Sequence, residues 1–132
     1  MNVNGYGEAS MSGVDITLET RTSPTGRYVF MATTDVEVGT ISMRSTDLVT
    51  SYEHVTDMLY DLRDFHDQLR HMVSCGEGEF VNDDLHISCW FLDNGSFHFT
   101  LDSPDLYITG DDFTADDARE LYKAVHELLY GE

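Results

Sequence analysis

Residues 55–73 contain the pattern that most constrains the fold of this chain. Their apolar side chains recur every three or four positions, which places them along one stripe of an α-helix. The stripe consists of Val55, Met58, Leu59, Leu62, Phe65, His66, Leu69, Met72 and Val73. "TSYE", residues 50–53, matches a capping box, and Gly76 follows as a suitable left-handed cap. We therefore expect one amphipathic helix whose apolar stripe must be buried against other elements.

The segments before this helix show the alternation that is typical of β-strands. In "VDITLET", which begins at Val14, apolar and polar side chains alternate strictly, so we expect a half-buried strand. The turn-forming sequence "SPTG" follows, and "RYVFMATT" after it predicts the second strand of a hairpin. "VEVGTISMRS" predicts a third strand, with a turn or bulge at Gly39.

The second half of the chain repeats this arrangement. The runs "LHISCWFL" and "SFHFTL" flank "DNG", residues 93–95, which predicts a hairpin. "GEFV" before them and "DLYIT" after them are each expected to add a strand. A second helix closes the chain, with Thr114 placed as its N-cap, Asp117 at its third position and Phe113 positioned to pack against Ala118.

The predicted order of elements is βββ-α-βββ-α. Short connections and one apolar stripe on each helix indicate an α+β fold, with about six antiparallel strands in one or more sheets and two helices packed on one face. The length of 132 residues fits one domain, which we place at residues 13–132. Residues 1–12 are rich in Gly, Asn and Ser and are expected to form a flexible N-terminal tail.

The chain is strongly acidic, with 25 Asp and Glu against seven Lys and Arg and a formal net charge of -18. Such a surface repels nucleic acid and anionic membranes, and it attracts basic proteins. No apolar run approaches the ~20 residues of a membrane helix, and the first residues lack the features of a signal peptide. We expect a cytoplasmic protein that binds neither nucleic acid nor membrane directly. Solubility and adaptation to a salt-rich cytoplasm are alternative explanations of the charge.

Acidic side chains also supply the candidate partner-binding residues. Four of them lie in one row on the polar face of the first predicted helix: Glu53, Asp57, Asp61 and Asp64. A solvated helix face is the alternative interpretation, but such a row repels itself, and Lys and Arg of a partner would relieve that repulsion. The candidate set is completed by an acidic pair that helix capping does not explain and by an aromatic side chain on the polar face of the second hairpin: Asp111, Asp112 and Trp90.

The sequence shows no motif for catalysis or for a bound cofactor. "GDDFTADDARE", residues 110–120, does not match an EF-hand loop, and its second half places acids where they complement a helix N-terminus. None of the six His has zinc-site spacing, although His86 and His98 could face each other across the second hairpin. We expect no enzymatic activity, cofactor or metal, and hydrolysis by a metal-binding Asp cluster is the alternative.

Three stretches follow the N-terminal hairpin in order: "TSYEHVTDMLYDLRDFHDQL", "DLHISCWFLDNGSFHFTL" and "FTADDARELYKAVHELL". In this order and in its size the chain resembles the bacterial immunity proteins that are paired with wall-associated polymorphic toxins. The resemblance implies a stoichiometric inhibitor that blocks a toxin, often a basic nuclease. The second hypothesis is a nucleic-acid mimic of the anti-CRISPR or antirestriction kind, whose carboxylates would stand in for phosphates in a nucleic-acid-binding channel.

Overall fold

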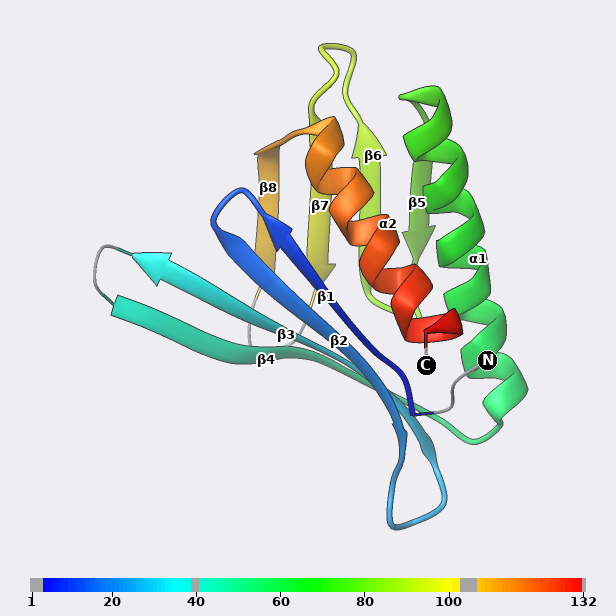
Figure 1. Ribbon diagram of the computed structural model, residues 1–132. Coiled ribbons are helices and arrows are strands. Elements are labelled where there is room, and N and C mark those ends of the chain that lie inside the picture. The colour runs from blue at the N-terminus through cyan, green and yellow to red at the C-terminus, as the bar shows by residue number, and fades with distance from the viewer. Residues whose placement is uncertain (1–3, 39–40, 103–106, 132) are drawn as a thin grey trace.

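The computed structural model describes residues 4–38, 41–102 and 107–131, and the side chains of residues 35–49 and 101–112 also lie outside this description (Figure 1). The first four-stranded antiparallel sheet consists of β1 (Tyr6–Met11), β2 (Val14–Thr22), β3 (Tyr28–Val38) and β4 (Ile41–Tyr52). Helix α1 (Val55–Cys75) follows. The second four-stranded sheet consists of β5 (Glu79–Asn82), β6 (Ile87–Phe91), β7 (Phe97–Asp102) and β8 (Tyr107–Phe113), and helix α2 (Ala115–Tyr130) follows it.

The structure confirms the α+β class and the antiparallel pairing, but it has eight strands where about six were expected. The expected second strand, residues 27–34, continues as far as Val38 in β3, and β4 begins at Ile41. The expected third strand over residues 36–45 is therefore divided between the end of β3 and the beginning of β4, and this division adds no strand to the count. The turn or bulge expected at Gly39 lies outside the described residues.

The strand without an expected counterpart is β1, which occupies much of the segment that was expected to be a flexible tail. Ala9 and Met11 are buried in the core, and β1 pairs with β2 along its whole length. A Cβ added to Gly5 or Gly7 would lie 2.0 Å from a backbone carbonyl oxygen of α2. The small residues that suggested a loose tail instead allow the backbone of β1 to approach the helix directly.

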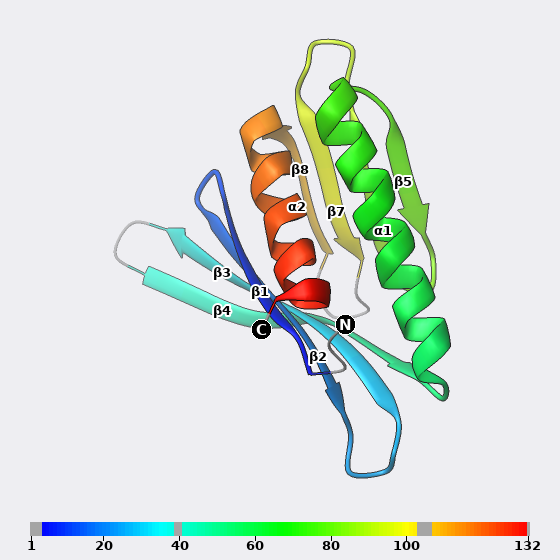
Figure 2. The ribbon, with the colours of Figure 1, turned by 45° about the vertical axis from the view of Figure 1, so that its right-hand side comes forward.

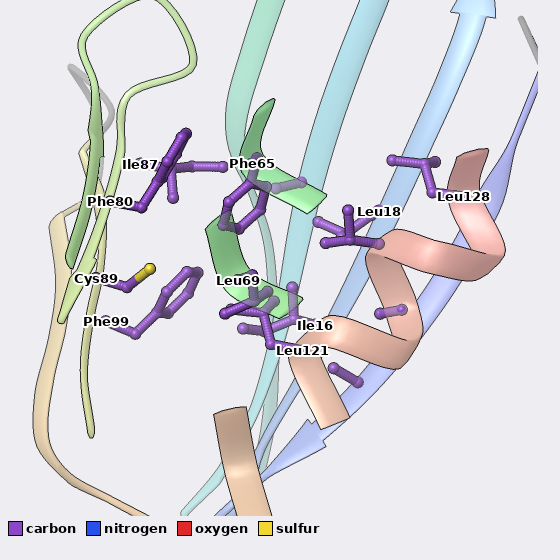
Figure 3. Close-up of a cluster of buried hydrophobic side chains, with 14 of the residues drawn as sticks. Ile16, Leu18, Phe65, Leu69, Phe80, Ile87, Cys89, Phe99, Leu121 and Leu128 are labelled. Carbon is purple, nitrogen blue, oxygen red and sulfur yellow. The ribbon is translucent and has the colours of Figure 1, made fainter. Parts of the chain in front are cut away.

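The core lies between the inner faces of the two sheets and is filled from both helices (Figure 3). Helix α1 contacts β5 as well as β3 and β4, and α2 contacts β1 and β2 as well as β7, so each helix joins the two sheets. The helices also pack against each other (Figures 1 and 2). The buried side chains of α1 are those of the predicted stripe: Met58, Leu62, Phe65, His66, Leu69 and Met72.

The two helices begin in different ways. At α2 the predicted cap is confirmed, because the Thr114 hydroxyl accepts a hydrogen bond from the Asp117 N–H and the Asp117 carboxylate accepts one from the Thr114 N–H. At α1 the expected capping box at residues 50–53 is wrong. Thr50 and Tyr52 are paired with β3, and His54 is the N-cap without a side-chain hydrogen bond. Sheet pairing here overrides a local capping signal.

Candidate partner-binding groove

An open groove forms where β4 leads into α1 and where the turn between β5 and β6 approaches them. Its volume is about 590 Å³. We call it the acidic groove, and its lining consists of Thr50, Ser51, Tyr52, Glu53, His54, Asp57, Tyr60, Asp61, Asp83, Asp84 and His86. The groove thus combines five carboxylates with two tyrosines and two histidines.

Three of the acids predicted from the helix row, Glu53, Asp57 and Asp61, line this groove. Two further acids, Asp83 and Asp84, come from the turn after β5. Among the described residues, Glu53 forms an ion pair with an arginine, since its Oε1 lies 3.4 Å from the Arg27 guanidinium. In the part of the chain that the structure describes, Asp57, Asp83 and Asp84 form no ion pair.

Tyr52 fixes one wall of the acidic groove. Its hydroxyl donates a hydrogen bond of 2.8 Å to Oδ2 of Asp61, which joins the end of β4 to α1. Burial raises the pKa of Tyr52 most, and the Asp61 hydrogen bond and the negative charges of Asp61, Asp84 and Asp57 raise it further. Acids from both sides of the groove therefore act on the same hydroxyl.

Tyr60 is the most exposed large hydrophobic side chain of the described residues, at 72%. It lies on α1 between Asp57 and Asp61 in sequence and lines the acidic groove with them. An aromatic ring held open beside carboxylates suits a guanidinium or an ammonium group, which carboxylates attract by charge and the ring attracts through its π face. Tyrosine is also among the residues that are enriched at binding hot spots.

The turn after β5 has a defined conformation that holds Asp83 and Asp84 in place. The Leu85 N–H donates a hydrogen bond of 2.9 Å to Oδ1 of Asn82, three residues earlier, which closes the turn locally. The Thr50 hydroxyl donates a bond of 3.4 Å to the Asp84 carbonyl oxygen, which links the turn to β4. The two acids thus remain near β4 although they are about thirty residues away in sequence.

The remaining predicted site residues do not join this groove. Asp64 is exposed on α1 but is not part of the lining. Trp90 is partly buried on the outer face of the second sheet, where its ring stacks on His98 with a centroid distance of 4.1 Å. Asp111 and Asp112 belong to β8 by their backbone, and their side chains lie outside the described residues.

The histidines are arranged differently from the expectation. His98 is opposite Trp90 in the sheet register, and His86 precedes β6 with a φ of 56°, so the two do not face each other across the hairpin. The buried His66 instead lies at the contact of the helices, with Nε2 3.0 Å from Nδ1 of His126 and Nδ1 2.9 Å from Oδ1 of Asp67. Its role is to join α1 to α2.

Among the described residues, no group of three or more His, Cys, Asp or Glu side chains is arranged to hold a metal ion. What the acidic groove offers chemically is a set of hydrogen-bond acceptors and negative charges around an exposed aromatic ring. These features match the side chains of Arg and Lys.

Neither helix in the described ranges has the length and apolar character that crossing a bilayer requires. No family model, curated protein or solved structure matches the chain.

Proposed function

We propose that this chain is a non-enzymatic acidic binding protein that inhibits a basic protein partner, and that it acts as an immunity protein against a nuclease-like bacterial toxin. One observation carries the proposal. Acids from α1 and from the turn after β5 converge on one groove around the exposed ring of Tyr60. The groove thus concentrates on one site the carboxylates that a basic partner requires.

The energetics of the free protein support a binding role for these acids. Asp57 and Asp61 are four residues apart on α1, and like charges at this spacing destabilise a helix by a few tenths of a kcal/mol. Asp83 and Asp84 add negative charge opposite them. A partner that inserts Arg or Lys would relieve this repulsion, so the groove gains more from a basic protein than from a neutral one.

The net charge of -18 would also speed association with a basic partner. Oppositely charged proteins associate at roughly 10⁸–10⁹ M⁻¹s⁻¹ at low salt because the field steers their encounter. A rapid inhibitor is what a cell needs against a toxin it produces. We place this action in the cytoplasm, and the two free thiols, Cys75 and Cys89, agree with a reducing compartment.

The test is a pull-down from the native host with immobilised protein, at low and at high salt, followed by mass spectrometry. The groove variant carries Asp57→Lys and Asp83→Lys, which leave the Tyr52–Asp61 hydrogen bond intact. The matched control carries Asp93→Lys and Glu127→Lys, two exposed acids outside the acidic groove, and has the same net charge.

We expect a basic protein that the wild type and the control retain and that the groove variant loses, with at least tenfold weaker affinity when the purified pair is measured. Inhibition of that protein's nuclease activity at a one-to-one ratio would support the immunity role. Equal loss with both variants would mean that bulk charge, and not the groove, attracts the partner. A CRISPR or restriction effector whose nucleic acid competes with the chain would instead support mimicry.

A further inference from the structure

Strand β5 forms one edge of the described second sheet, with β6 as its neighbour (Figure 1). The direction of its backbone groups follows from one hydrogen bond. The Phe91 N–H donates to the Gly78 carbonyl oxygen at 3.1 Å, and this pair continues the register by one residue beyond Glu79 and Trp90, which are opposite each other. Directly opposite residues that are hydrogen-bonded alternate with pairs that are not. The N–H and C=O groups of Glu79 and Val81 therefore point away from β6.

These outward groups are accessible. Glu79 is exposed, and Val81 is 60% exposed, one of the most exposed large hydrophobic residues in the described part of the chain. Their side chains lie on the outer face of the sheet, whereas Phe80 between them is buried and stacks on Phe65 of α1 with a centroid distance of 4.8 Å. Helix α1 thus covers the inner face at Phe80, and the Glu79 and Val81 backbones have no hydrogen-bond partner among the described residues.

The acidic residues around this edge determine which kind of strand can pair with β5. Glu77 and Glu79 lie at its beginning, and Asp83 and Asp84 follow its end, all of them exposed. No Lys or Arg occurs from residue 71 to residue 118. Pairing with β5 of a second copy would bring these acids together and is therefore disfavoured. A strand that carries Lys and Arg would neutralise them.

We propose that the free edge of β5 binds an extended basic segment of the partner protein as a fifth strand of the second sheet. The main-chain groups of Glu79 and Val81 supply the hydrogen bonds, and the exposed Val81 contacts an apolar side chain of the added strand. Since Asp83 and Asp84 both follow β5 and line the acidic groove, the added strand leads its basic side chains into that groove. The inference rests on the proposed function only in taking the partner to be basic.

The test uses a synthetic nine-residue peptide of alternating Lys and Val with blocked ends, and a second peptide of the same sequence with N-methylated central residues. The two carry the same charge, but the second cannot form a strand ladder. On the protein side, Val81→Pro removes the outward N–H at a sheet edge, where proline is tolerated, and Val81→Thr keeps this N–H and alters only the side-chain contact. Affinity is measured by calorimetry, and the amide signals of Glu79 and Val81 are followed by NMR.

We expect the unmethylated peptide to shift these two amide signals and to slow their hydrogen exchange. N-methylation and Val81→Pro should each weaken binding at least tenfold, and Val81→Thr, which loses only the apolar contact, should weaken it clearly less than Val81→Pro does. A far-UV spectrum and a thermal melt check that the proline variant folds, and the methylated peptide tests the inference without altering the protein.

Equal affinity of both peptides for all three proteins would overturn the edge inference and leave the basic-partner proposal standing. The absence of any peptide binding at millimolar concentration would also overturn the edge inference. A different result would contradict the proposed function: a host partner that is not basic, or one that binds the groove variant as tightly as the wild type.

Discussion

The Tyr52 hydroxyl and the Asp61 carboxylate are joined by a hydrogen bond of 2.8 Å that ties the last residue of β4 to α1. The bond crosses the wall of the acidic groove, so the position of the α1 acids relative to β4 depends on it. Asp61 therefore has a structural partner, whereas Asp57 is exposed and without an ion pair in the described part of the chain. The helix row contains acids with different roles.

Replacement of Tyr52 by Phe should lower the free energy of unfolding by about 1 kcal/mol, because the buried side of Asp61 loses its donor. The measurement is urea unfolding at neutral pH. Tyr60→Phe is the control, since Tyr60 is exposed and makes no hydrogen bond among the described residues. Equal stability of the two variants would show that the Tyr52–Asp61 bond contributes nothing.

The environment of Tyr52 also predicts that the stability of the fold depends on pH in the alkaline range. The pKa of Tyr52 is raised in the folded protein, mainly by burial and then by Asp61, so folding favours the neutral phenol. This contribution is fully present below the unfolded pKa of about 10 and is lost as pH rises above it toward the folded pKa. The wild type should lose more stability between pH 9 and pH 11 than Tyr52→Phe does. Parallel curves for the two proteins would contradict this.

The close approach of β1 to α2 gives a second stability prediction. A Cβ at position 7 would lie 2.0 Å from the Ala124 carbonyl oxygen, so Gly7→Ala must push the strand and the helix apart. We expect a loss of about 3 kcal/mol, at the upper end for overpacking, because backbone must move. Ser10→Ala, at an exposed position of the same strand, should change stability by less than about 0.5 kcal/mol. Thermal unfolding of both variants provides the comparison.

Some elements of this fold are specified by local sequence signals, and others are specified by contacts between distant segments. The α1 stripe and the hairpin at "DNG" were predictable because their signals are local: the Leu92 N–H donates to the Ser96 carbonyl oxygen at 2.8 Å, and Gly95 has a φ of 85°. Strand β1 was not predictable from composition, since Gly5 and Gly7 are selected by contact with a helix more than a hundred residues away.

The acidic groove, too, could be predicted only in part from the sequence. The helical spacing of Asp57 and Asp61 was visible in the sequence, but their meeting with Asp83 and Asp84 depends on how the β5–β6 turn packs beside β4. The exposed acids in "VNDDLH" were the only available signal, and a turn of that composition is usually just solvated. For Tyr60 a signal was available, because it is absent from the apolar stripe of α1 and lies between Asp57 and Asp61 in the sequence.

The two cysteines should differ in reactivity. Cys75 is exposed at the end of α1, whereas Cys89 is buried in β6, and burial raises the pKa of its thiol to about 12. Because the thiolate is the reactive form, iodoacetamide at pH 8 should modify Cys75 at least about a hundredfold faster than Cys89. Mass spectrometry of the native protein should show one modification, Cys75→Ser should show none, and unfolding in urea should release the second thiol. Two rapid modifications of the native protein would show that β6 opens readily.

Asp116 and Asp117, in the first turn of α2, differ most clearly among the acids of residues 110–120. Asp117 is buried, and its Oδ2 accepts hydrogen bonds from the Thr114 N–H at 2.8 Å and from the Ser12 hydroxyl at 2.5 Å, so it caps the helix and ties it to the turn after β1. Asp116 is exposed and forms an ion pair with Arg119 on the surface.

Asp117→Ala should therefore cost about 2 kcal/mol, because it leaves two donors without their acceptor, and Asp116→Ala should cost less than about 0.5 kcal/mol. Chemical denaturation of both variants measures the difference. Ser12→Ala should show part of the Asp117→Ala loss, since it removes one of the two bonds. If Ser12→Ala and Asp117→Ala were additive in the double variant, the two residues would not act through a shared bond, and the tie between the β1–β2 turn and α2 would have to be abandoned.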